Sequence, residues 1–319
     1  MGRKTLDSKL INFCIELKGQ GLDNHQISKK VNAKFKTKHN SETIRKCLKK
    51  YTMPIIEFEK PKMPKILAID IETKPLTAFV WGLWNNDVSL NMLGSDWSIL
   101  SWCAKWVGED HIYYQDLRGS KNINDDSKLL KQIWQLMDEA DIILSQNGVR
   151  FDVPKLNSRF IINGMQPPSS FRQIDTKIMA RKFGFTSNKL EYLTNKLCKK
   201  NKKSKHAKFS GFAMWDECMK GNKEAWKEME EYNKMDVLSL EELYFKLAPW
   251  DNKINFSVYN DDDEPTCSCG SQSFKKSGFA YTNSSKFQKY KCTNCGREVR
   301  DKINLLDKHK RRNMKSNIQ

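Results

Sequence analysis

The stretch KILAIDIET at residues 65–73 decides the fold that the sequence predicts. Its apolar residues run without a break from Ile66 to Ile69, which is typical of a strand that is buried on both faces of a sheet. Asp70 and Glu72 interrupt this run two positions apart, and the period of two in a strand places both carboxylates on one side. The sequence therefore predicts a central strand with two acidic side chains on one face.

The segments that follow this strand predict an α/β domain. WSILSWCAKWV at 97–107 and DHIYYQDL at 110–117 have the composition of two further strands, which would extend the first into an antiparallel meander. A helical stripe of apolar residues covers 127–139, and the short apolar strand DIILSQ follows it. Helices are expected after NGVRFD and in IDTKIMARKF, NKLEYLTNKL and the long segment that ends in LEELYFKL. This order favours an α/β sandwich with a mixed sheet and flanking helices.

The composition excludes an acidic or neutral metabolic enzyme as the default interpretation. The 319 residues include 56 Lys and Arg against 38 Asp and Glu, which gives a formal charge of +18 and a pI near 9.4. Hydrophobic residues make up 39%, enough for a core despite the excess charge. Because no apolar run is long enough to span a bilayer and no secretory signal opens the chain, we expect a cytoplasmic protein without membrane partners.

The positive charge is concentrated at the two ends of the chain. Residues 1–53 carry a net charge of +9 and residues 266–319 a net charge of +10, whereas residues 54–265 are close to neutral at −1. Two short basic flanks beside a neutral core indicate added modules that meet a polyanion, and nucleic acid is the first candidate. The expected organisation is a helix-turn-helix-like module at 1–53, a linker at 54–64, a core domain at 65–250, a linker at 251–265, a four-cysteine ribbon at 266–301 and a basic tail at 302–319.

The N-terminal flank has the pattern of three short helices. Asp23 with Gln26 resembles a capping box at the start of the second helix, and Ser41 can cap the third. The third helix is basic, so in a helix-turn-helix it would enter the major groove of DNA. The alternative is a small helical bundle with a solvated basic face. The side chains predicted to contact nucleic acid are Arg45, Lys46 and Lys49.

Four of the nine cysteines form two close pairs near the C-terminus. Cys267 and Cys269 are separated from Cys292 and Cys295 by 22 residues. Without a secretory signal, such pairs indicate metal ligands rather than disulfides, and four thiolates suit one tetrahedral structural Zn²⁺. The first pair is Cys-x-Cys rather than the usual Cys-x-x-Cys, and the alternative is four free thiols. Between the pairs, FAYTNSSKFQKYKC alternates aromatic and basic residues, as in a β-ribbon with a nucleic-acid face.

Further acidic residues lie in apolar surroundings elsewhere in the core. Asp152 follows an asparagine-glycine turn, and Asp236 lies one helical turn after Tyr232, on the same face. Carboxylates within apolar runs are costly unless a cation compensates them. Together with Asp70 and Glu72, these acids suit two Mg²⁺ or Mn²⁺ ions. The alternative is that the acids are helix caps and surface ion pairs.

Three of these segments resemble a known set of motifs. DIET at 70–73, NGVRFD at 147–152 and YNKMD at 232–236 are similar, in order and spacing, to the three exonuclease motifs of the DEDD superfamily of RNase H-like 3′-to-5′ exonucleases. The Tyr-x-x-x-Asp form resembles the tyrosine subclass, and the second motif resembles the proofreading domain of family B DNA polymerases. The C-terminal helix and the cysteine ribbon are also similar to those of stand-alone phage exonucleases, described as polymerase exonuclease subunits.

The resemblance implies a role for each matching residue. Asp70 would bridge two metal ions, Glu72 and Asp236 would complete the site of the ion that activates water, and Asp152 would hold the second ion through waters. Tyr232 would orient the attacking water, since a phenol with an ordinary pKa near 10 is a poor base at neutral pH. The residues implied to contact the nucleic acid are Thr73, Asn147 and Phe151. For Phe151, packing in the core is the favoured alternative.

The sequence as a whole predicts a metal-dependent 3′-to-5′ exonuclease that acts on the 3′ end of DNA, most simply single-stranded. A proofreading or DNA-processing role beside a separate polymerase or replication protein is one expectation. An RNase or a structure-specific endonuclease on the same fold is the first alternative. The second alternative is a DNA-binding replisome adaptor without activity. The sequence does not decide between DNA and RNA, and it leaves the oligomeric state open.

Overall fold

The computed structural model describes residues 8–51, 63–201, 208–251, 253–259 and 264–315. Contacts within the chain group it into two compact units, residues 1–62 and 63–319. Most of the expected linker 54–64 and the end of the expected basic tail lie outside the described ranges.

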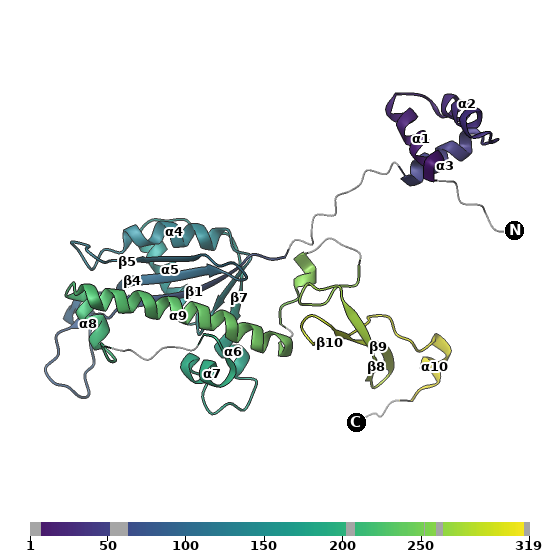
Figure 1. Ribbon diagram of the computed structural model, residues 1–319. Helices are drawn as coiled ribbons and strands as arrows, with labels where there is room; N and C mark the ends of the chain where they lie inside the picture. The colour runs from purple at the N-terminus through teal and green to yellow at the C-terminus, as the bar shows by residue number, and fades with distance from the viewer. Residues whose placement is uncertain (1–7, 52–62, 202–207, 252, 260–263, 316–319) are drawn as a thin grey trace. The chain divides into compact units, whose positions relative to one another are not determined.

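The first unit consists of three helices around a small apolar core (Figure 1). These are α1 (Ser8–Gly19), α2 (Asn24–Phe35) and α3 (Ser41–Tyr51). The expected capping box is confirmed, because the Asp23 side chain accepts from the backbone N–H of Gln26 while the Gln26 side chain accepts from that of Asp23. The core joins buried apolar side chains of all three helices, namely Leu10, Cys14, Leu17, Ile27, Val31, Ile44 and Leu48.

The predicted cap of α3 is wrong by one residue. Ser41 is the first helical residue, and the side chain of Asn40 instead accepts hydrogen bonds from the backbone N–H and the hydroxyl of Thr43, both at 2.8 Å. Asparagine and serine are both good caps, so the sequence alone could not separate two adjacent candidates.

The second unit contains a five-stranded mixed sheet with the order β5-β4-β1-β6-β7. Strand β1 pairs antiparallel with β4, and β4 pairs antiparallel with β5, which confirms the expected meander. On the other side, β1 pairs parallel with β6, and β6 pairs parallel with β7. The bounds of the strands are Ile66–Lys74 for β1, Ser98–Trp106 for β4, Ile112–Asp116 for β5, Ile142–Ser145 for β6 and Arg172–Asp175 for β7.

Helices cover both faces of this sheet, with α4 along one side and α9 along the other (Figure 1). On β1, Leu67, Ile69 and Ile71 join the hydrophobic cluster that includes α4 and α5, whereas Ile66 and Ala68 join the cluster that includes α6, α7 and much of α9. This alternation confirms a strand that is buried on both faces. The helices are α4 (Ser127–Asp138), α5 (Asp152–Ile162), α6 (Thr176–Ala180), α7 (Leu190–Leu197), α8 (Ala213–Met219) and α9 (Lys223–Leu247).

Several short elements differ from the sequence-based expectation. The segment RQID forms β7, although Ile174 and Asp175 were expected at the start of the helix IDTKIMARKF, and α8 was not predicted. Along the chain, the segment that connects β1 to β4 forms a small two-stranded sheet of β2 (Thr77–Ala78) and β3 (Leu93–Ser95). It also contains the 3₁₀ helix η1 (Leu90–Met92). Elements of two to seven residues have too few positions to establish a period.

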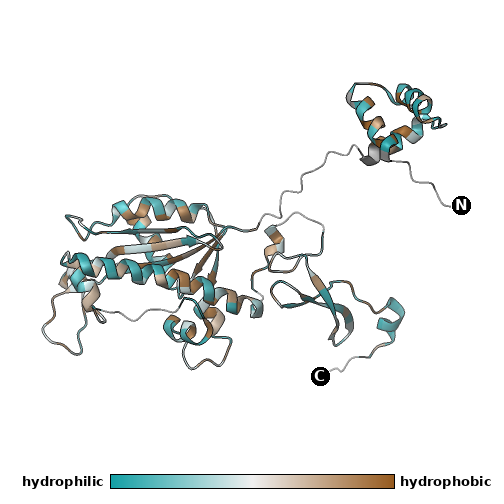
Figure 2. Ribbon diagram, viewed as in Figure 1, coloured by the Kyte–Doolittle hydropathy of each residue, from teal (hydrophilic) through white to brown (hydrophobic). Residues whose placement is uncertain are grey.

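The C-terminal part of the second unit is a three-stranded antiparallel ribbon with the order β10-β9-β8. Its strands are β8 (Phe274–Thr282), β9 (Ser285–Cys292) and β10 (Glu298–Arg300). The 3₁₀ helices η2 (Ala248–Trp250) and η3 (Phe256–Tyr259) precede it, and the short basic helix α10 (Lys308–Asn313), uniformly hydrophilic in Figure 2, follows it. No helix within the described ranges combines the length and apolar character that a bilayer-spanning segment needs.

These elements confirm the expected fold class, which is α/β with a mixed sheet and flanking helices, together with small N- and C-terminal additions.

Candidate metal-dependent active site

Asp70 and Glu72 lie on the central strand, near the end where the chain leaves the sheet. They follow Ile66 and Ala68 in the alternation of β1, so they occupy the face covered by α9. The pairing of β1 with β4 shifts between Glu72 and Thr73, which is a β-bulge. Bulges twist a strand and re-aim its side chains, and they are frequent beside active sites.

Asp236 on α9 completes a cluster of three carboxylates. Asp70, Glu72 and Asp236 each offer an oxygen atom, and these atoms all lie within 4.8 Å of one another. Asp236 is buried, whereas Asp70 and Glu72 are partly exposed. Three carboxylates at this separation repel one another, and a bound cation would remove that repulsion. The structure therefore brings together three of the four acids that the sequence predicted as metal ligands.

Asn233 fixes the position of Asp70, a role that the sequence analysis missed. Its side-chain Nδ2 donates to Oδ2 of Asp70, and its Oδ1 accepts from the hydroxyl of Ser101 at 3.1 Å. Asn233 and Ser101 are both fully buried. Because Ser101 is on β4 and Asn233 on α9, this chain of hydrogen bonds ties the helix to two strands directly at the acid cluster. The signal in the sequence is that Asn233 lies three residues before Asp236, on the same side of the helix.

Trp215 on α8 plays a similar part for Glu72. The indole Nε1 donates to Oε2 of Glu72 at 3.2 Å, and the indole ring meets the ring of Tyr232 edge to face, with centroids 6.3 Å apart. Tyr232 lies one helical turn before Asp236 on α9, as the spacing predicted. Trp215 thus connects one acid of the cluster to the predicted water-orienting tyrosine. No pattern in the sequence indicated this contact, since α8 itself was not predicted.

Asp152, the fourth predicted acid, lies outside the three-carboxylate cluster. It is buried in the first turn of α5, and its Oδ1 accepts from the backbone N–H of Ile71, between the two acids of β1, at 3.1 Å. Burial raises the pKa of Asp152 from its usual value to about 7, although the hydrogen bond from Ile71 acts in the opposite direction. In this structure Asp152 anchors the start of α5 to the central strand.

The turn that precedes Asp152 is organised by Asp175, which the sequence analysis did not single out. Asn147 adopts a left-handed conformation with φ of 70°, and its backbone N–H donates to Asp175 at 2.9 Å. The side chain of Asn147 accepts from Nζ of Lys177 at 3.2 Å. Gly148 packs so closely that an added Cβ would lie 2.0 Å from Oγ of Ser145. The second motif is therefore a tightly held loop.

The predicted nucleic-acid contacts fall in different environments. Phe151 is 36% exposed, so the favoured alternative that it packs in the core is wrong. Its ring lies 5.7 Å from Nζ of Lys155, which also lies 3.6 Å from the ring of Trp97. Thr73 is partly exposed on β1, directly after the bulge. The segment after β1 exposes several large apolar side chains, which are Phe79, Val80, Trp81, Leu83, Trp84, Val88 and Leu90.

On the N-terminal unit, Arg45 and Lys46 are exposed on α3. Arg45 forms two hydrogen bonds of 2.8 Å to Glu42, and Lys46 lies 3.7 Å from the same carboxylate. Part of the positive charge of this helix is therefore compensated locally. The side chain of Lys49 lies outside the described part of the structure.

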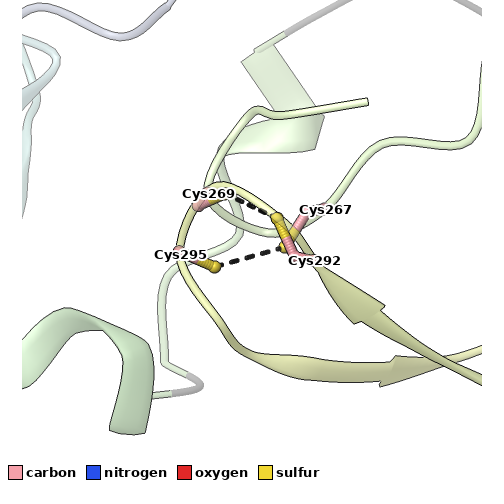
Figure 3. Close-up of side chains that lie close together, drawn as sticks. All are labelled: Cys267, Cys269, Cys292 and Cys295. Carbon is pink, nitrogen blue, oxygen red and sulfur yellow. Dashed lines mark hydrogen bonds between the residues drawn. The ribbon is translucent and has the colours of Figure 1, made fainter. Parts of the chain in front are cut away.

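The four paired cysteines converge at one end of the ribbon (Figure 3). The Sγ atoms of Cys267 and Cys295 are 3.9 Å apart, those of Cys269 and Cys292 are 3.7 Å apart, and all four ligand atoms lie within 4.8 Å of one another. A tetrahedral zinc with Zn–S bonds of about 2.3 Å separates its sulfur atoms by about 3.8 Å. The donor set and its spacing therefore fit one Zn²⁺, and the Cys-x-Cys spacing does not prevent this arrangement.

A family model agrees with the architecture of the core. Residues 99–248 match the family model of the RNase H superfamily, a range that contains β4 to α9 but not Asp70 and Glu72. No curated protein sequence has significant similarity to this chain. Among solved structures, the family B DNA polymerase of the hyperthermophilic archaeon Pyrobaculum calidifontis matches with a TM-score of 0.44 and 15% identity, over 60% of this chain and 25% of the polymerase chain. This chain thus spans about a quarter of the polymerase's length.

The sheet order and the flanking helices are those of an RNase H-like fold, in agreement with the family match over residues 99–248, and this class of fold fits a nuclease. Divalent metal ions are the cofactors such nucleases use, and the carboxylate cluster offers the oxygen ligands that Mg²⁺ and Mn²⁺ prefer.

The hydrogen bond from Trp215 leads to the first testable prediction. Trp215→Phe keeps an aromatic ring beside Tyr232 but removes the donor to Glu72, so Glu72 should be held less well. Loss of such an outer partner typically lowers metal affinity about 10-fold or more. Titration calorimetry with Mn²⁺ should therefore show weaker binding. The matched control is Trp134→Phe, since the Trp134 indole donates to the backbone oxygen of Gln166 instead. Equal Mn²⁺ affinity in both variants would contradict the positioning role.

Proposed function

We propose that this protein is a divalent-metal-dependent 3′-to-5′ exonuclease that hydrolyses DNA phosphodiesters by a two-metal mechanism. The observation that carries the proposal is the cluster of Asp70, Glu72 and Asp236 on an RNase H-like sheet, with Tyr232 one helical turn before Asp236. The motif resemblance to the tyrosine subclass of the DEDD exonucleases supports the direction of cleavage.

In this proposal the three clustered carboxylates would hold the metal ions, and Asp152 would contribute to the second ion through water. Bound divalent cations would neutralise the scissile phosphate and lower the pKa of a water molecule. Asn233 keeps Asp70 in place, and Trp215 keeps Glu72 in place, so both act as positioning residues. Tyr232 orients the attacking water by a hydrogen bond from or to its hydroxyl group. Hydrolysis would release nucleoside 5′-monophosphates.

The exposed side chains around the cluster suit an incoming strand. Phe151 and Thr73 are accessible beside the motifs that carry the acids, and Lys155 lies next to Phe151. The side chain of Asn147 is held by Lys177, at the turn before α5. We assign Thr73, Asn147 and Phe151 to contacts with the terminal nucleotide. We also propose that the basic terminal modules, 1–53 and 266–319, increase the affinity for DNA through contacts with its phosphates. Such contacts do not depend on the base sequence.

A separate polymerase or replication protein is the proposed setting for this activity, with the exonuclease as a proofreading or DNA-processing subunit. The resemblance to proofreading domains supports this setting. Arg45, Lys46 and Lys49 on the third helix are the proposed DNA contacts of the N-terminal module.

The decisive experiment is digestion of a 5′-labelled single-stranded DNA with Mg²⁺ or Mn²⁺, beside a matching RNA and a circular single-stranded DNA. The expected result is a ladder that shortens from the 3′ end of linear DNA, with the circle intact. Cleavage of the circle would favour an endonuclease, and preferential cleavage of RNA would favour an RNase. No cleavage of any substrate with either metal would overturn the enzymatic proposal in favour of a DNA-binding adaptor.

A further inference from the structure

One face of the C-terminal ribbon carries a row of accessible aromatic rings. Phe279 and Tyr281 stand two residues apart on β8, so both rings lie on the same side of the ribbon. They are 43% and 70% exposed. Single exposed aromatic residues are ordinary on a protein surface, but two adjacent exposed rings on a narrow ribbon indicate a binding surface.

Cationic and polar side chains are interleaved with these rings. Lys286 lies opposite Tyr281 in the register of β8 and β9, and its Nζ is 3.9 Å from the ring centroid of Phe279 and 6.0 Å from that of Tyr281. Gln288 lies opposite Phe279, and Lys276 lies opposite Tyr290. The Gln288 side chain donates to the backbone oxygens of Gly278 and Lys289, so Lys276 and Lys286 are the groups among these that can meet a phosphate.

The same face continues into a cleft of about 500 Å³. Two further aromatic residues line it, Phe274 and Tyr290, whose rings meet edge to face at 6.1 Å. Lys302 also lines the cleft, as do the acids Glu264 and Asp301. Arg300 is a further lining residue, but its guanidinium lies over Phe287 on the opposite face. A β-bulge between Lys276 and Phe279, with Gly278 at φ of 93°, lies between the exposed pair and the cleft. The aromatic residues thus form a track along one face of the ribbon.

On the opposite face of the ribbon the aromatic surface is covered, although Lys275 and Lys291 are exposed there. Its aromatic residue, Phe287, is only 8% exposed, and the guanidinium of Arg300 covers the ring at 3.8 Å. Lys289 on this face is paired with Glu298 at 3.1 Å. The rings of Phe279 and Tyr281 are far more exposed than that of Phe287, so the two faces differ in the aromatic surface that they offer to a ligand.

We propose that Phe279, Tyr281, Lys276 and Lys286 form a stacking platform for the unpaired bases of single-stranded nucleic acid. Stacking on aromatic rings is tolerant of sequence because every base has a π-face, and it requires bases that are not paired in a duplex. The net charge of +10 over residues 266–319 matches a polyanionic strand. The inference rests on the proposed function in one respect, which is that the captured strand would be the nuclease substrate.

The test measures binding rather than cleavage, so that a failure of the exonuclease proposal cannot be confused with a failure of this one. Full-length protein carrying Asp70→Asn, without added Mg²⁺ and without chelator, is titrated into fluorescein-labelled single-stranded oligothymidine and into a duplex of the same length. Phe279→Ala/Tyr281→Ala should weaken single-strand binding about 30-fold or more, since each stacked base contributes roughly 1–3 kcal/mol. Duplex binding should change little.

The matched control keeps both rings at the same positions. Phe279→Tyr/Tyr281→Phe preserves the π-surfaces and should retain single-strand affinity, while Lys286→Ala should weaken it and reduce its dependence on salt. An oligonucleotide of abasic sites supplies the backbone without bases, and the alanine variant should no longer distinguish it from oligothymidine. Unchanged single-strand affinity in the alanine variant, with zinc retained, would overturn the proposal. So would an equal loss of affinity for single strand and duplex, because that result indicates charge or folding rather than stacking.

Discussion

Asp70→Asn is expected to reduce turnover on single-stranded DNA about 10³-fold or more, which corresponds to roughly 4 kcal/mol of lost transition-state stabilisation. Asparagine has the shape of aspartate and can keep a hydrogen bond with Asn233, so the packing at β1 should survive. The neutral amide, however, cannot supply the negative charge that would share a divalent cation with Glu72 and Asp236. The loss should therefore appear in kcat rather than in the yield of folded protein.

The stability of the same variant provides an independent check. Without metal, three carboxylates share one small region, and removing one charge relieves their repulsion. Asp70→Asn should therefore melt at the same temperature as the wild type or higher in metal-free buffer, but gain less from added Mg²⁺. Asp110→Asn, an exposed acid in the turn between β4 and β5, is the control and should keep full activity. An active Asp70→Asn protein would remove the central assumption of the proposed function.

The parts of the fold that the sequence predicted are those with long, regular patterns. The first four residues of β1, Ile66 to Ile69, are apolar on both faces, and the stripe in α4 repeats over three turns, so each pattern identifies its element without the rest of the chain. β7 and α8 have four and seven residues, and no side chain caps the start of α8. Their positions are determined by tertiary contacts, such as the parallel pairing of β7 with β6, which leave no periodic signal.

The candidate site was predictable only where an unusual residue interrupts a pattern. Asp70 and Glu72 stand out because each interrupts an apolar strand, and Asp236 because it repeats the face of Tyr232. Asn233 and Trp215 contact these acids directly, but neither interrupts a pattern in the sequence. Asn233 is one of many polar residues of α9, and Trp215 lies on α8, which was not predicted. Phe151 shows the opposite error, because an apolar residue beside a buried acid was assigned to the core while the backbone turned it toward solvent.

The zinc site provides the second large expected effect. In the ribbon, the buried side chains within the described range 264–301 are Cys267, Phe287 and Cys292, so two of the three are predicted metal ligands. An apolar core of one phenylalanine cannot offset the conformational entropy of some 36 ordered residues. A structural zinc, worth roughly 10–16 kcal/mol in zinc-finger peptides near neutral pH, would supply the missing free energy. The ribbon should therefore fold only when the metal is bound.

Cys292→Ser is the sharpest test of this dependence, because Cys292 ends β9 and is buried next to Cys269. Bound zinc, measured by atomic absorption on freshly reduced protein, should fall from about one equivalent to less than about one tenth. Trypsin should then cleave within the lysine-rich strands β8 and β9 while the nuclease core stays intact. Cys198→Ala, a buried cysteine of that core, should keep its zinc and its resistance. If the Cys292→Ser ribbon resists trypsin as well as the wild type does, the metal is not what folds it, and the stacking platform would have to be held by side-chain packing alone.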